Sequence, residues 1–186
     1  YAPRQRNSRN ENKKIKNGVI PEEWEKPENK SKLAQKDIDA DWTKKNGERH
    51  FGYKDHVKCD ADSKLITNYS VTSASVHDSQ RCLVFIGQED EVLYADSAYS
   101  GKPIALALPE NCKNQICEKG YRNSPLTSEQ KMNNRRKSRI RCRIEQIFGF
   151  MTGAMHGITI RSIGITRAWM NIGITNLVYN FCRYSY

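Results

Sequence analysis

The sequence predicts an α/β fold in which a mixed β-sheet is covered by flanking helices. Residues 49–60 and 65–75 alternate apolar and polar side chains, as β-strands do. Residues 91–100 contain a third strand-like run, Val-Leu-Tyr-Ala. After Pro125 the apolar residues recur at helical spacing. Strands followed by helices are typical of a sheet with helices packed on it.

The composition indicates a soluble chain with a polyanionic partner. The 186 residues suffice for one domain, and 37% are hydrophobic while 28% are charged. The net charge of +10 favours nucleic acid as the partner, although a basic protein without such a partner is the alternative. No apolar run approaches the length of a membrane span, so we expect no membrane association.

The six cysteines show no CxxC pair, and the spacing from Cys112 to Cys117 is too wide for a usual zinc knuckle. We interpret them as reduced thiols that serve mainly as packing groups. A cytoplasmic location follows from this interpretation.

Residues 1–42 differ from the rest of the chain. They are rich in Arg, Lys and Asn, and two prolines and several acids follow. We expect a largely irregular polar arm with Ile15, Ile20 and Trp24 as anchors. Such an arm either follows a phosphate backbone or is a solvated linker. The folded domain is expected over residues 43–186.

The strands at 49–60 and 65–75 are expected to form an antiparallel hairpin around a turn at 60–64. A short helix is predicted over 76–87, with Ser75 or His77 near its start. The run at 91–100 is the third strand, and residues 111–120 are a short fourth one.

Two helices close the chain. Thr127 and Gln130 offer a capping-box start to the first. Its apolar stripe consists of Ile140, Ile144, Ile147 and Met151. The second helix is expected over residues 166–184, and we expect a stripe of it to pack on the sheet. Its members are Ile174, Leu177, Val178 and Phe181.

Asp96 and Glu145 are the carboxylates best placed for chemistry. Asp96 directly follows the third strand, where a side chain is held rigidly and yet reaches water; a turn or helix-cap role is the alternative. Glu145 lies on the first long helix, four residues after Arg141. A plain Arg141–Glu145 helix pair, worth about 0.2–0.5 kcal/mol, competes with a metal-binding role. Two-metal phosphoryl transfer needs carboxylates from several rigid elements, so a third acid is expected.

A run of six cations precedes Glu145 on the same helix, and phosphate contact is favoured over a merely solvated face. The residues are Arg135, Arg136, Lys137, Arg139, Arg141 and Arg143.

Four segments, taken in order, resemble the DDE transposases of bacterial insertion sequences: HFGYKDHVKCD, LITNYSVTSASVHDSQ, YADSAY and RIRCRIEQIFG. The resemblance covers most of residues 37–186. It implies an RNase-H-like catalytic domain that cuts and joins double-stranded DNA with Mg²⁺ or Mn²⁺. It also implies that Asp96 is the second catalytic acid, Glu145 the terminal one and Arg141 the arginine one turn before it.

The chain departs from that family at several positions. Ser138 and Thr152 stand where many relatives have a Tyr and a Lys. The family's first acid precedes a segment resembling residues 2–7, and only Tyr1 precedes it here. The first catalytic acid and the first strand are therefore expected to be missing, as in a partial or inactive copy. Substitutes for the lost ligand could come from the acids of the N-terminal half, although a turn role is favoured for the last of them: Asp37, Asp39, Asp41 and Asp60.

The leading functional hypothesis is DNA transposition by metal-dependent cleavage and strand transfer. It entails transposon ends and target DNA as partners, a homodimer in the DNA complex and a nucleoid location in a bacterial cytoplasm. A non-catalytic DNA-binding remnant and another RNase-H-like nuclease are the alternatives.

Overall fold

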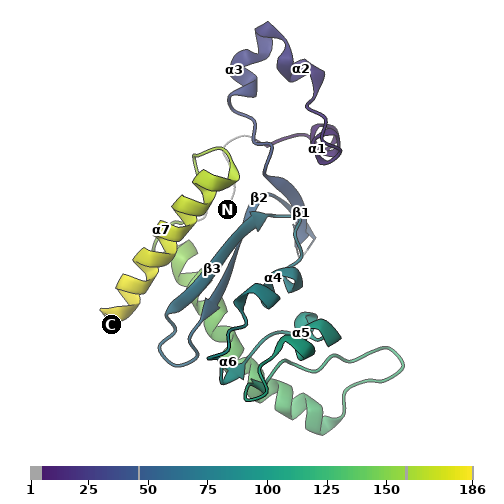
Figure 1. The fold of residues 1–186 in the computed structure, drawn as a ribbon, viewed down its shortest axis with the longest axis vertical. Helices are drawn as coiled ribbons and strands as arrows, with labels where there is room; N and C mark the ends of the chain where they lie inside the picture. Colours follow the sequence, from purple (N-terminus) through teal and green to yellow (C-terminus); the bar gives the residue numbers. More distant parts are fainter. Residues whose placement is uncertain (1–5, 46, 158, 186) are drawn as a thin grey trace. The chain divides into compact units, whose positions relative to one another are not determined.

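The computed structural model describes residues 6–45, 47–157 and 159–185. It has the predicted α/β class, with helices and two small sheets (Figure 1). The chain divides into an N/C unit (residues 1–56, 69–76 and 150–186) and a central unit (residues 57–68 and 77–149). The expectation of a missing first strand rested on Tyr1 and the segment after it. Tyr1 and most of that segment lie outside the described residues.

The described residues contain the four strands that the sequence predicted and a fifth, which precedes them in the chain. β1, β2 and β3 form an antiparallel sheet in that order, and β4 and β5 form a separate parallel pair. Antiparallel and parallel pairing are thus both present, but in two separate sheets of the described residues and not in the one mixed sheet that the sequence predicted. The bounds are β1 (Asp41–Lys45), β2 (Glu48–Cys59), β3 (Ile66–Ser73), β4 (Val92–Leu93) and β5 (Lys113–Asn114).

The helices include both long ones predicted near the C-terminus. Thr127 and Gln130 form the predicted capping box at the start of α6, with both backbone-to-side-chain hydrogen bonds present. None of the helices in the described part is long and apolar enough to cross a membrane. The bounds are α1 (Arg9–Lys16), α2 (Glu22–Glu25), α3 (Lys30–Leu33), α4 (Ser79–Phe85), α5 (Lys102–Ala107), α6 (Ser128–Gly153) and α7 (Ile165–Tyr184), with 3₁₀ turns η1 (Pro27–Asn29) and η2 (Ser97–Tyr99).

The segment expected to be an irregular arm contains α1 to α3. Ser8 caps α1 through a capping box with Glu11. Trp24 is 2% exposed and donates from Nε1 to Glu11, so it is one of the three anchors that the sequence suggested. Ile20 is exposed and does not serve as one.

The core of the N/C unit is built on β2 and β3. Phe51, Tyr53 and Val71 pack there with Ala168 and Ile172 of α7. Tyr53 also donates its hydroxyl hydrogen to the fully buried carboxylate of Asp37. Burial, and then the bond to Asp37, raise the pKa of the Tyr53 hydroxyl above its usual range, so that it remains a donor.

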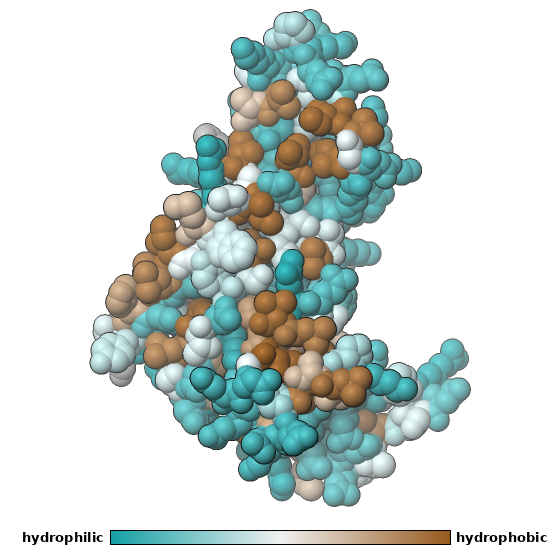
Figure 2. Space-filling view, viewed as in Figure 1, coloured by the Kyte–Doolittle hydropathy of each residue, from teal (hydrophilic) through white to brown (hydrophobic). Residues whose placement is uncertain are grey.

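Helix α7 packs with a different face from the one predicted. Ala168, Ile172, Asn176 and Tyr179 are buried. The predicted stripe is exposed instead, between 41% at Val178 and 63% at Phe181. Figure 2 shows hydrophobic atoms at the surface where Figure 1 places α7. Because α7 carries apolar residues on more than one face, periodicity alone could not choose the buried one.

The central unit has a small core of its own. Cys82 of α4, Ala95, Ile104 of α5 and Ile116 are buried together. At the β2–β3 turn, Asp60 Oδ1 accepts hydrogen bonds from the backbone N–H of Asp62 and Ser63 and from the Ser63 hydroxyl. The turn role predicted for Asp60 is therefore confirmed.

A buried carboxyl of the N/C unit makes its stability pH-dependent. Asp55 Oδ1 accepts one hydrogen bond, 3.4 Å from Asn176 Nδ2, and no described residue donates to its Oδ2. Burial raises the pKa of Asp55 from 3.8 to about 7, against the opposing effect of the Asn176 bond. The folded chain therefore holds a proton at this site that the unfolded chain has lost between these two values.

We predict that the free energy of unfolding falls as the pH rises from about 4 through 7, and that Asp55→Asn removes part of this fall. At pH 8 the variant should be more stable by roughly 2–4 kcal/mol, because it buries no charge, and at pH 4 it should differ little. Urea unfolding at several pH values measures this. Glu48→Gln, on the same strand with an 82% exposed side chain, is the matched control; an equal effect of both changes would contradict the assignment to Asp55.

Candidate functional site

Helix α6 is fastened to the strand segment that follows β5. The side chain of Asn134 accepts from the backbone N–H of Glu118 and donates to its carbonyl, both at 2.9 Å. Lys137 Nζ donates to the carbonyl of Ile116 at 3.0 Å, and Ser138 Oγ lies 3.8 Å from Cys117 Sγ. These residues recur at helical spacing, so one face of α6 lies against the strand.

The same strand segment positions Asp96. Parallel pairing of β4 with β5 continues past both strands through a hydrogen bond from Cys117 N to Ala95 O, 3.0 Å long. Ala95 is buried, and Asp96, directly after it, is exposed. Asp96 Oδ1 accepts from Ser97 N at 2.6 Å and caps η2. The capping role is thus real, and within the described residues Oδ2 is left without a donor.

Another carboxylate, Asp78, lies in the same surroundings as Asp96. Burial raises the pKa of Tyr99 to about 12, with further contributions from the charges of Asp78, Cys82 and Asp96. The sequence predicted a helix start near Ser75 or His77. Helix α4 does begin close to His77, with Asp78 as its N-cap and His77 Nδ1 2.8 Å from Ser79 Oγ. No signal in the sequence linked Asp78 and Asp96 to the hydroxyl of one tyrosine.

Glu145 is paired as its spacing predicts. Arg141 Nη2 lies 3.0 Å from Glu145 Oε1. The arginine side chain is 29% exposed and the glutamate 64% exposed, so the pair contributes little to stability. Asn133, Lys137, Arg141 and Glu145 are spaced four apart and form one ridge along α6.

Asp96 and Glu145 belong to the same unit, and the segment after β5 connects the chain before Asp96 to α6. The contacts run from Ala95 through Cys117 to Ser138, and Glu145 lies about 10 Å farther along the axis of α6. No group of three or more His, Cys, Asp or Glu side chains in the described ranges is gathered closely enough to hold a metal ion. Carboxylate oxygens are hard ligands of the kind that Mg²⁺ prefers.

The six cations preceding Glu145 have different surroundings. Lys137 bonds Ile116, Arg141 pairs with Glu145, and Arg143 lies 3.7 Å from Asp62. The other three are exposed, and among the described residues their side chains have no hydrogen-bonding or ionic partner. They are Arg135, Arg136 and Arg139.

The acids considered as substitute ligands have structural partners. Asp37 accepts from Tyr53, from the backbone N–H of Gly164 and from two neighbouring amides. Asp39 accepts from Ile165 N at the start of α7, and Asp41 pairs with Lys16 at 2.7 Å. All three belong to the N/C unit, whereas Asp96 and Glu145 belong to the central unit.

Comparison with known proteins identifies the family. The family model described as "Transposase DDE domain" matches residues 8–181. The chain belongs to this transposase family. No solved structure matches it.

A curated relative agrees with this assignment. The chain is 34% identical over 117 residues to the transposase for insertion sequence element IS1106 of Neisseria meningitidis serogroup B. The match covers 61% of this chain and 40% of that transposase. The matching segment therefore spans less than half of the relative's length.

We predict that Asn134→Ala loosens α6 from the strand segment after β5. Two hydrogen bonds to the Glu118 backbone are lost and a partly buried N–H and C=O are left unpaired, which costs about 1–3 kcal/mol. Amide hydrogen exchange at Glu118 measures the effect locally, and it should accelerate by one to two orders of magnitude. Asn133→Ala is the control, since its side chain forms no hydrogen bond with a described residue; equal exchange rates in both variants would refute the anchor.

Proposed function

We propose that this chain carries out DNA transposition by metal-dependent cleavage and transfer of phosphodiester bonds, within a domain of RNase-H-like architecture. The observation that supports this most is the arrangement around α6 in a member of the transposase DDE domain family. A helix with a row of unpaired cations carries Glu145, and it is fastened to the strand segment beside the one that ends in Asp96.

Asp96 and Glu145 are the proposed metal ligands in this reaction. Asp96 offers Oδ2, and Glu145 is exposed enough to exchange its pairing with Arg141 for a cation. A bound Mg²⁺ or Mn²⁺ would acidify the attacking water or 3′-hydroxyl and stabilise the leaving oxygen. Arg141, released from Glu145, would hold a phosphate oxygen beside the reacting bond. Two carboxylates make a thin shell, so water, phosphate or a further acid must complete it.

Arg135, Arg136 and Arg139 are the proposed contacts to the backbone of double-stranded DNA. Their charges are exposed and not neutralised by the described residues, which favours phosphate binding. The transposon ends and the target are the DNA partners proposed here, with two copies of the protein in the complex and a location at the bacterial nucleoid.

A non-catalytic DNA-binding protein is the second candidate function. It is favoured by the absence of a three-carboxylate cluster from the part of the chain that the structure describes. In that case the cations of α6 would bind DNA, and the metal-dependent step would not occur.

The catalytic proposal predicts that Mg²⁺ supports nicking of DNA that contains the element's ends. Asp96→Asn and Glu145→Gln should each reduce the nicking rate by at least about 100-fold, since each removes a metal ligand. Glu129→Gln, which changes an exposed acid in the first turn of the same helix, should nick like the unaltered chain. DNA binding without nicking in all forms would favour the second candidate, and nicking that survives both site changes would exclude these ligands.

DNA binding by α6 should depend steeply on salt. Replacing Arg135 and Arg139 by Ala should reduce the slope of log K against log salt by about 2, because each phosphate contact contributes about 0.9. Fluorescence anisotropy of a labelled duplex between 50 and 200 mM salt measures the slope. Lys30→Ala with Lys32→Ala, a charge-matched change in α3, is expected to leave it unaltered.

A further inference from the structure

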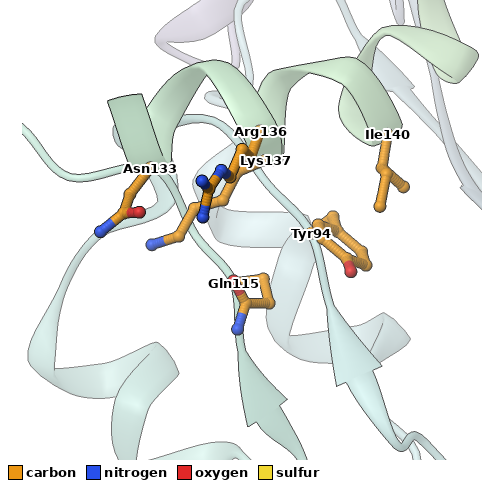
Figure 3. A pocket seen from close by; sticks show the side chains of 6 residues that line it. All are labelled: Tyr94, Gln115, Asn133, Arg136, Lys137 and Ile140. Atoms are coloured by element: carbon orange, nitrogen blue, oxygen red, sulfur yellow. The ribbon is translucent and has the colours of Figure 1, made fainter. Parts of the chain in front are cut away.

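The central unit has a hollow of about 440 Å³ where the ends of β4 and β5 meet helix α6. Its volume suits one small ligand of nucleotide size, and it is too small for a DNA duplex. Figure 3 shows residues of the strands on one side and of α6 on the other. The lining residues are Tyr94, Gln115, Asn133, Arg136, Lys137 and Ile140.

The lining has an apolar end and a cationic middle. Tyr94 and Ile140 lie together at one end, and Asn133 lies at the other, with Arg136 and Lys137 between them (Figure 3). An aromatic ring beside an aliphatic side chain offers a stacking platform for a nucleobase. Two cations beside it suit a phosphate, and none of the six lining residues is acidic.

Most of these groups are available for a ligand. Within the described ranges, the guanidinium of Arg136, the amide of Gln115 and the hydroxyl of Tyr94 have no partner. Lys137 uses one of its three N–H donors on the carbonyl of Ile116. Unpaired donors and acceptors lining a hollow favour a polar ligand, since the fold does not use them.

Both walls of the hollow lead to the proposed metal ligands. Tyr94 precedes Asp96 by two residues in an extended segment, so their side chains are on the same side. Lys137 is on the α6 ridge that continues through Arg141 to Glu145. A DNA strand whose reacting phosphodiester lies at Asp96 and Glu145 could therefore place a neighbouring nucleotide in the hollow.

We propose that the hollow binds one unpaired nucleotide of the DNA strand that reacts, with its base on Tyr94 and its phosphate on Arg136 and Lys137. This inference rests on the proposed function for its place in the reaction. The binding itself needs no metal. A nucleotide inside a duplex is stacked and paired on both sides, so only one that has left the stack can enter.

The test compares a fluorescent duplex that contains one unpaired nucleotide with the same duplex fully paired, both in EDTA, by fluorescence anisotropy. The unaltered chain should bind the unpaired form more tightly. Tyr94→Ala should weaken that binding about tenfold or more, the usual effect of losing a stacking partner, and leave the paired duplex unaffected. Tyr94→Phe, which keeps the ring, should retain the preference.

Three further variants separate this site from general DNA binding. Arg136→Ala should reduce the preference for the unpaired form, whereas Arg135→Ala, its neighbour outside the hollow, should weaken both forms equally. Gln115→Ala, which removes a side chain without a partner in the described fold, should also reduce the preference even if Tyr94→Ala fails to fold.

Equal binding of both DNA forms by the unaltered chain would overturn the proposal. So would equal losses for both forms in Tyr94→Ala, Arg136→Ala and Gln115→Ala. Because no metal is present, a preference that depends on Tyr94 would stand even if Mg²⁺ supported no nicking. Nicking without such a preference would leave the proposed function intact and exclude the nucleotide site.

Discussion

The attachment of α6 to the strand segment after β5 is the contact on which the candidate site depends. Asn134 bonds both backbone groups of Glu118, as a neighbouring strand would, and Lys137 donates to the carbonyl of Ile116 two residues upstream. Unpaired backbone groups at a sheet edge are costly when they are withdrawn from water. The helix thus covers an edge that needs partners, and this requirement fixes which face of α6 points outward.

The fixed orientation of α6 explains how this helix can carry so many positively charged side chains. α6 has seven basic residues and two acidic ones, and like charges four apart destabilise a helix. Asp62 and Glu145 offset two of the charges, and Lys137 donates to a backbone carbonyl. The other four remain unneutralised by the described residues, which is understandable if a polyanion completes the surface: Lys131, Arg135, Arg136 and Arg139.

The N/C unit shows how surroundings decide the role of a carboxyl group. Asp37 is fully buried and accepts hydrogen bonds from a hydroxyl and from three backbone amides, so its charge is compensated. These bonds connect the loop before β1 to β2 and to the start of α7. Asp55, on the same strand as Tyr53, has one long hydrogen bond from Asn176. Desolvation then favours its protonated form. Such a group costs stability at neutral pH and marks a place where the packing is not optimised.

The sequence by itself determined the α/β class, the β2–β3 hairpin with its Asp60 turn, the capped start of α6 and the Arg141–Glu145 pair. Each of these depends on contacts within a few residues or on a strong period, and such signals are local. Tertiary structure alone decided the buried face of α7, the anchors of α6 and the hollow at Tyr94. In these cases several faces or partners satisfy the local pattern equally well, and burial against distant segments selects one of them.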